Sequence, residues 1–140
     1  MASEIVVKDV YNFLKRFPPF DLMEENELLE LASGVKMKYI APGEEIIKKG
    51  NEPLDYFFVV HKGSILITEN EGGEDLLIDQ CDEGDIFGVR ASIAQDEYIA
   101  DATAEEESLL YTIPMPQFNE IMAKNSREAL FLTAGFASGL

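Results

Sequence analysis

The sequence predicts a mainly β protein of the α+β class: an antiparallel β jelly roll, or double-stranded β-helix, with helices at both ends. Apolar residues recur with helical spacing only near the two ends of the 140-residue chain. Between them, short apolar runs are separated by turn signals at regular intervals, a pattern typical of sandwiches, barrels and jelly rolls. We therefore expect one domain over residues 1–140, with helices within 5–34, the jelly roll over 35–114 and helices within 115–140.

The N-terminal part has the spacing of two amphipathic helices. Apolar side chains at positions i, i+3, i+4 and i+7 predict a helix over Val7 to Leu14. Pro18 and Pro19 end this pattern, because proline cannot donate a helical hydrogen bond. A second helix is expected from Glu24 to Ser33, followed by Gly34 as its cap.

The central part alternates apolar segments with turn residues. Four segments rich in β-branched and aromatic residues are predicted as strands: 56–60, 65–68, 76–78 and 109–113. Glycine, which permits tight turns, stands between β segments at positions 43, 50, 63, 84 and 88. After Pro114 and Pro116, helices are expected over 117–123 and from Arg127 onward.

The charge balance limits the classes of partner. Eleven lysines and arginines oppose 27 aspartates and glutamates, giving a formal net charge of −16. Such a surface repels phosphate backbones and anionic membranes, so direct nucleic-acid binding is not expected. No apolar run approaches the roughly 20 residues that span a bilayer, and the first residues do not read as a secretory signal. The single cysteine, Cys81, excludes an internal disulfide and fits a reducing compartment, so we expect a cytoplasmic protein with no membrane partner.

Residues for catalysis or for a metal centre are scarce. Metal-binding cupins, which are also jelly rolls, need several histidine and carboxylate ligands. The chain has one histidine, His61, which precedes a turn and is expected to be solvent-exposed. Any nucleophile–histidine pair would depend on this one residue, and Cys81 is expected to be a core or strand residue. We therefore expect no catalytic residue, no metal and no cofactor, and a chain that is not an enzyme by itself.

An ordered series of short stretches resembles the cyclic-nucleotide-binding domain family. The stretches are Pro42-Gly43-Glu44, Lys49-Gly50, Tyr56-Phe57-Phe58-Val59-Val60, Lys62-Gly63-Ser64 and Glu83-Gly84-Asp85-Ile86-Phe87-Gly88. The resemblance covers roughly residues 12 to 125 and implies a jelly roll of about eight strands flanked by helices. It also implies a regulatory domain whose ligand is a cyclic or other nucleotide.

The resemblance makes the stretch after Phe87 a phosphate-binding cassette. In the family, a glutamate accepts a hydrogen bond from the ribose hydroxyl, and an arginine pairs with the cyclic phosphate. Val89 stands at the glutamate position here, and the arginine position is Tyr98, or with a small shift Ile99 or Ala100. Each lost charge-assisted contact costs about 1.5–3 kcal/mol, so weak or absent cyclic AMP binding is expected. The expected ligand-binding residues are those of this divergent cassette: Gly88, Val89, Arg90, Ala91, Ser92, Tyr98, Ile99 and Ala100.

One cation remains in the cassette, Arg90, at a position that the family usually fills with an apolar residue. In one arrangement, Arg90 turns inward and supplies the missing positive charge from a different place. In the other, it points to solvent or pairs with Asp96 or Glu97. The second arrangement is the one we expect.

Three segments resemble one subgroup of the family, in which such a domain precedes paired CBS domains and a nucleotidyltransferase domain in bacterial signalling proteins. They are residues 17–20, 87–91 and 110–114. This resemblance implies an excised regulatory module whose covalently linked output domains would hold any nucleotidyltransferase activity. Two functions stay open: a ligand sensor with a divergent pocket, or a protein-interaction or dimerisation domain with a vestigial pocket filled by Tyr98, Ile99 and their neighbours.

The C-terminal residues carry an apolar stripe made of Leu130, Phe131, Phe136 and Leu140. Exposed together on a helix, they would form the kind of apolar patch that marks an interface. Such a helix either folds back on the barrel or pairs with a second copy. We expect the homodimer, because isologous pairing is the commonest route of assembly.

Overall fold

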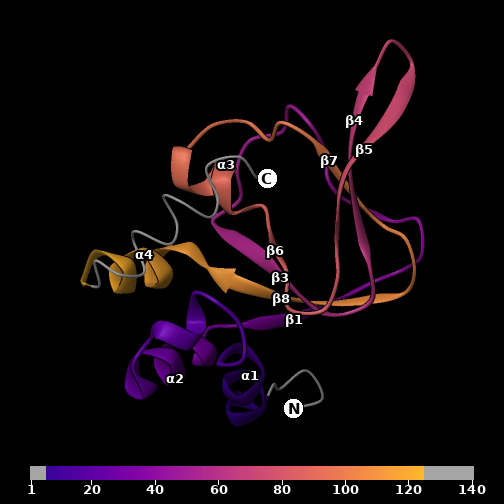
Figure 1. Ribbon diagram of the computed structural model, residues 1–140. Coiled ribbons are helices and arrows are strands. Elements are labelled where there is room, and N and C mark those ends of the chain that lie inside the picture. The colour runs from indigo at the N-terminus through magenta and orange to yellow at the C-terminus, as the bar shows by residue number, and fades with distance from the viewer. Residues whose placement is uncertain (1–5, 125–140) are drawn as a thin grey trace.

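Two four-stranded antiparallel sheets form the body of the computed structural model, which describes residues 6–124 (Figure 1). The strands are β1 Lys36–Ile40, β2 Glu45–Ile47, β3 Tyr56–Lys62, β4 Ile65–Glu71, β5 Glu74–Cys81, β6 Ile86–Phe87, β7 Asp101–Ala104 and β8 Ser108–Pro114. The helices are α1 Val7–Leu14, the 3-10 helix η1 Phe20–Leu22, α2 Glu25–Ser33, α3 Val89–Ala94 and α4 Met115–Lys124. One sheet has the strand order β1-β8-β3-β6, and the other has the order β2-β7-β4-β5. The predicted antiparallel jelly roll, with helices at both ends and a short helix after Gly88, is confirmed.

Strand β3 lies between two hydrophobic clusters and is buried on both faces over residues 57–60. Phe57 and Val59 belong to the cluster on the helix side, whereas Phe58 and Val60 belong to the cluster between the sheets. Side chains alternate across a strand. Burial on both faces therefore requires an unbroken apolar run, as the sequence shows over residues 57–60.

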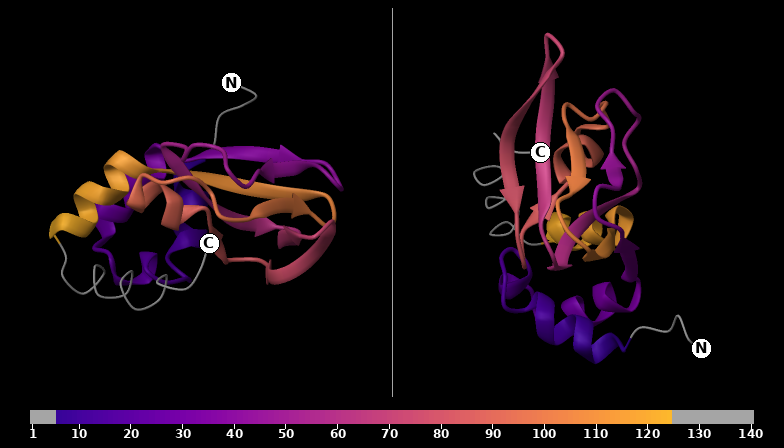
Figure 2. Two further views of the ribbon diagram at one scale, coloured as in Figure 1. Left: turned by 90° about the horizontal axis from the view of Figure 1, so that it is seen from above. Right: turned by 90° about the vertical axis from the view of Figure 1, so that its right-hand side faces the viewer.

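The outer cluster joins the helices to the sheet that contains β3. Its members are Val10, Phe13, Leu14, Phe20, Met23, Leu28, Leu31, Ala32, Val35, Phe57, Val59, Val89, Tyr111, Ile113, Met115, Phe118, Ile121 and Met122. A capping box begins α2, where the backbone N–H of Glu24 donates to Oε1 of Glu27 at 3.2 Å. Figure 2 shows α1, α2 and α4 gathered at one end of the molecule, away from the tip of the β4–β5 hairpin.

The inner cluster fills the space between the two sheets. Its members are Ile40, Ile47, Phe58, Val60, Ile65, Ile67, Cys81, Phe87, Ala91, Tyr98, Ala100, Ala102, Ala104 and Leu110. Cys81, at the end of β5, is 3% exposed, and burial raises the pKa of its thiol to about 12. The expectation that Cys81 is a core residue is confirmed, since such a thiol stays protonated and packs as a small apolar group.

The helices differ from the expectation in their bounds. Helix α4 begins at Met115, because Pro116 occupies its first turn, where a missing N–H costs little. The 3-10 helix over Phe20–Leu22 was not expected. The helix expected from Arg127, and the apolar stripe that ends at Leu140, lie outside the described residues. No helix within residues 6–124 has the length and hydropathy needed to cross a bilayer.

The expectation that His61 is a solvent-exposed turn residue is wrong. His61 belongs to β3, where its ring stacks on Tyr111 with centroids 4.6 Å apart and meets Phe13 edge-on at 4.7 Å. Its Nδ1 atom is buried and has no hydrogen-bond partner. Burial, together with the positive charge of Lys62, lowers the pKa of the imidazole, so the neutral form suits this aromatic contact. Strand β3 ends at Lys62, so the turn that was expected to start at His61 comes after Lys62.

We expect the free energy of unfolding to decrease as the pH falls below about 6.5, the ordinary histidine pKa. His61 is protonated more readily in the unfolded chain, so its contribution is complete above that value and is lost as the pH falls through the lower folded pKa. A His61→Phe variant should lose this part of the pH dependence and be at least as stable near pH 7, because no imidazole nitrogen is left buried and unpartnered. Urea denaturation between about pH 5 and 8 measures both effects, and identical pH profiles in the two proteins would contradict the assignment.

Candidate functional site

Gly88 sets the backbone geometry of the cassette by joining β6 to α3 in the left-handed region, with φ 81° and ψ 5°. A Cβ atom at this position would lie 3.2 Å from Cδ1 of Ile47 and 3.4 Å from Cδ2 of Phe58. Both the backbone conformation and the available space therefore favour glycine. No side chain caps the first turn of α3. The turn that the resemblance implied after Phe87 is present.

Helix α3 divides its side chains between the two hydrophobic clusters. Val89 is 1% exposed and packs in the outer cluster, whereas the equally buried Ala91 packs in the inner cluster. The hydroxyl of Ser92 donates to the backbone carbonyl of Leu54 at 2.8 Å. Val89 thus occupies the position of the ribose-binding glutamate as a core side chain that offers no polar group.

Arg90 is half-buried, and its Nη1 atom is enclosed without a hydrogen-bond partner. The expected pairing with Asp96 or Glu97 is not found, since Arg90 forms no ion pair with any described residue. Both carboxylates are exposed, and the arginine is not. A buried guanidinium nitrogen without an acceptor costs free energy, so an acceptor brought to it would stabilise the folded state.

Tyr98, one of the three residues expected at the position of the phosphate-binding arginine, makes its contacts inside the protein. Its side chain is 3% exposed, and its hydroxyl accepts a hydrogen bond from the backbone N–H of Leu54 at 3.0 Å. Burial raises the pKa of this phenol, and the hydrogen bond with the Leu54 backbone opposes the rise. The side chain is therefore neutral and anchors a neighbouring loop, instead of supplying positive charge.

The loop between β2 and β3 is the part of the site that the sequence did not reveal. The N–H of Gly50 donates to the carbonyl of Tyr98 at 2.9 Å, and the N–H of Tyr98 donates to the carbonyl of Asn51 at 3.0 Å. Leu54 adds the two contacts described above. The loop and the segment after α3 are therefore joined through both backbone and side-chain hydrogen bonds.

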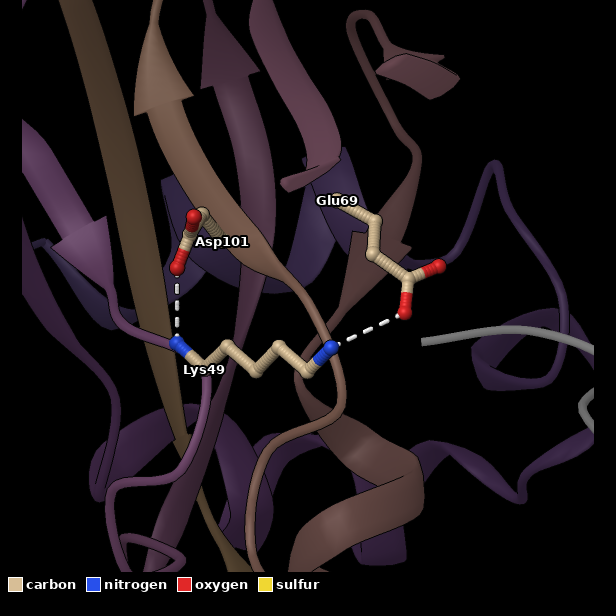
Figure 3. A network of polar contacts seen from close by, with 3 residues as sticks. All are labelled: Lys49, Glu69 and Asp101. Atoms are coloured by element: carbon tan, nitrogen blue, oxygen red, sulfur yellow. Dashed lines mark hydrogen bonds and ion pairs between the residues drawn. The ribbon is translucent and has the colours of Figure 1, made fainter. Parts of the chain in front are cut away.

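Lys49 connects this loop to two further strands of the second sheet (Figure 3). Its backbone N–H donates to Oδ1 of Asp101 on β7 at 2.7 Å, and its Nζ pairs with Oε2 of Glu69 on β4 at 3.0 Å. The Asp101 carboxylate beside the cassette thus holds the backbone of the loop, while the ammonium group of Lys49 pairs with Glu69. The only sequence signal for this arrangement was the Lys49-Gly50 stretch of the family pattern.

The last two expected site residues differ in exposure. Ile99 is 46% exposed, whereas Ala100 is 3% exposed in the inner cluster. The structure therefore brings Ala91, Ser92 and Tyr98 close to the barrel interior and leaves Ile99 at the surface. Within residues 6–124, no group of three or more His, Cys, Asp and Glu side chains could hold a metal ion.

A Tyr98→Phe substitution removes the acceptor of the Leu54 N–H and keeps the ring. We expect the free energy of unfolding to fall by about 1–3 kcal/mol, because an N–H group in a partly buried position is left unsatisfied. The matched control is Tyr39→Phe, which removes an exposed hydrogen bond of 2.9 Å to Oε2 of Glu107 and should cost less than about 0.5 kcal/mol. Urea denaturation measures both variants, and equal losses would contradict the anchoring role of Tyr98.

Residues 37–125 match the cyclic nucleotide-binding domain family. Human cGMP-dependent protein kinase 2 is 30% identical over 100 residues, which are 70% of this chain and 13% of the kinase. The cAMP-dependent protein kinase regulatory subunit of Blastocladiella emersonii is 27% identical over 104 residues, which are 74% of this chain and 26% of that protein. The chain thus spans only 13% and 26% of the length of these two relatives.

Several solved structures share the fold. The sensor domain of the transcriptional regulator DNR from Pseudomonas aeruginosa has a TM-score of 0.82 at 21% identity, covering 94% of this chain and 89% of that chain. The regulatory domain of Toxoplasma gondii PKA with cAMP has a TM-score of 0.81 at 22% identity, covering 92% of this chain and 49% of that chain. The regulatory subunit of a cAMP-independent protein kinase A from Trypanosoma cruzi, bound to guanosine, has a TM-score of 0.78 at 20% identity, with coverages of 94% and 47%. The sequence match, together with the two-sheet body and the turn at Gly88, shows that the chain belongs to the cyclic nucleotide-binding domain family.

Proposed function

We propose that this domain senses a small ligand of the nucleotide or nucleoside class and binds cyclic AMP weakly or not at all. One observation carries the proposal. The cassette keeps its backbone turn at Gly88, while the side chains expected at the positions of the family's glutamate and arginine make contacts inside the protein. Val89 packs in the outer cluster, and the Tyr98 hydroxyl binds the Leu54 N–H. The proposed ligand site comprises Gly88, Val89, Arg90, Ala91, Ser92, Tyr98, Ile99 and Ala100.

The missing contacts weigh most against a charged cyclic phosphate. Two lost charge-assisted hydrogen bonds, at about 1.5–3 kcal/mol each, correspond to a loss of about a hundredfold to several thousandfold in affinity. Two related proteins support a link between arginine and the cyclic phosphate. The T. cruzi regulatory subunit, described as cAMP-independent, is bound to guanosine, which has no phosphate. A Trypanosoma brucei variant with three substitutions, one of which introduces an arginine, is bound to cAMP in its A site.

Arg90 supports a polar ligand, because its buried Nη1 atom has no acceptor among residues 6–124. We propose that a ligand oxygen accepts a hydrogen bond from this guanidinium group. The interaction would replace part of the missing positive charge from helix α3, whereas the expected arginine position lies beyond the end of that helix.

A second candidate function is a protein-interaction domain with a vestigial pocket. The observation that favours it is the burial of Tyr98, whose hydroxyl already accepts a hydrogen bond from the backbone N–H of Leu54. In that case the cassette stabilises the barrel and no ligand raises the melting temperature.

We further propose that the domain is a cytoplasmic module that controls a covalently linked output domain. The support is that the matched relatives are much longer than the matched region. CBS and nucleotidyltransferase domains are the output that the sequence resemblance suggests.

A homodimer through residues Leu130 to Leu140 is also a proposal, and it rests on the apolar stripe in the sequence. Light scattering at tens of micromolar protein should report about twice the monomer mass. A Phe131→Asp variant should return the mass to that of the monomer. A monomer in both proteins would leave only the alternative in which the stripe packs on its own barrel.

The ligand proposal is tested by a thermal-shift screen of cyclic AMP, cyclic GMP, guanosine and adenosine, followed by calorimetry. A ligand that binds only the folded state raises the melting temperature. We expect a shift with at least one of these compounds, and no cyclic AMP binding at micromolar affinity. Arg90→Ala should abolish most of any shift, whereas Lys8→Ala, an exposed cation on α1, should leave it unchanged. Micromolar cyclic AMP binding would overturn the weak-binding proposal, and no shift with any compound would favour the vestigial pocket.

A further inference from the structure

A groove of about 570 Å³ lies along β1, and no cassette residue lines it among the described residues. Its lining residues come from α2's end, β1, the start of β3, β8 and α4: Gly34, Lys36, Met37, Lys38, Asp55, Tyr56, Thr112, Pro114, Pro116 and Gln117. Strand β1 is the edge of its sheet and pairs only with β8 (Figure 1). Within the described residues, the opposite edge of β1 has no strand partner, so alternate N–H and C=O groups are available there.

The groove is rich in hydrogen-bond donors that have no acceptor among residues 6–124. Lys36 and Lys38 are exposed and form no ion pair there, and the side chains of Tyr56 and Gln117 have no hydrogen bond there. Asp55 is the one carboxylate in the lining. On a chain with a net charge of −16, this is a local reversal of sign. The chemistry that fits such a lining is acceptor-rich and negatively charged.

The two lysines have the spacing of a strand. They pair with Thr112 and Leu110 of β8, so both side chains leave β1 on the same face. Residues i and i+2 of a strand are about 6.8 Å apart. A second extended segment has the same spacing between its alternate side chains and can place one carboxylate near each ammonium group.

We propose that an acidic, extended segment of a partner protein binds in this groove, adding a strand to β1 and setting alternate carboxylates against Lys36 and Lys38. Main-chain hydrogen bonds of the added strand would supply affinity, and the side chains at every second position would supply specificity.

A second copy of this chain fits the edge less well. Antiparallel pairing of β1 with itself, centred on Met37, places Lys36 opposite Lys38, and centring on Lys38 places two Lys38 side chains opposite each other. Like charges directly across a strand pair are destabilising. An acidic partner avoids this repulsion, and the proposal is independent of any ligand in the cassette.

The test is an NMR titration of the isotope-labelled chain with a capped hexapeptide of alternating glutamate and valine. We expect saturable shifts of the backbone amides of Lys36–Ile40 and slower hydrogen exchange of the N–H groups on the free edge of β1. The affinity should fall with added salt, because exposed charges are screened. The matching lysine–valine peptide should not bind.

Variants distinguish this site from general charge attraction. Lys36→Glu/Lys38→Glu should weaken the acidic peptide at least about tenfold and allow the lysine–valine peptide to bind. The control, Lys8→Glu/Lys48→Glu, makes the same charge change at exposed positions outside the groove and should leave the affinity within about twofold. The proposal is overturned by equal weakening in both variants, by shifts outside the groove, or by no saturable shift at millimolar peptide. Equal shifts with free glutarate, without slower exchange at β1, would also overturn it, because they would indicate a small-anion site.

Discussion

The position of the cassette depends on one constraint, the burial of strand β3 on both faces. Phe57 and Val59 face the helices, and Phe58 and Val60 face the other sheet. Helix α3 spans the boundary between these clusters, with Val89 in the outer one and Ala91 in the inner one. Because each fully buried apolar side chain is worth about 1.5–3 kcal/mol, the helix is held from both sides. A shift of the sheet therefore moves the cassette with it.

Hydrogen bonds then couple the cassette to the loop between β2 and β3. Ser92 and Tyr98 hold the carbonyl and the N–H of Leu54, and Gly50 and Asn51 bond to the backbone of Tyr98. A small ligand at α3 would thus act on two segments that are distant in sequence. A ligand changes a conformational equilibrium only through different affinities for its states, and these shared bonds are where such a difference could arise.

Charge is distributed unevenly in spite of the strong overall acidity. Lys49 pairs with Glu69 through its ammonium group and donates its backbone N–H to Asp101, so its positive charge compensates Glu69 and not Asp101. Arg90 keeps one enclosed nitrogen without an acceptor among residues 6–124. At the edge strand β1, Lys36 and Lys38 line a groove in which Asp55 is the one carboxylate among the described residues. Net charge describes the average field of the chain, whereas binding depends on these local departures from it.

The sequence by itself determined the order of elements and the backbone of the cassette. Helical spacing over residues 7–14, the apolar run 57–60 and the glycine at position 88 each reflect a local requirement, and the structure confirms all three. Such local patterns do not predict which residues that are distant in the sequence come into contact.

Only the tertiary structure decided the chemistry of the site. It placed His61 against Tyr111, 50 positions apart in the chain, and Tyr98 against Leu54, 44 positions apart. It also left Arg90 half-buried without the ion pair that its acidic sequence neighbours suggested. A periodicity predicts which face of an element is apolar, but the partner of a polar group is set by the approach of other elements, which no neighbouring residue encodes.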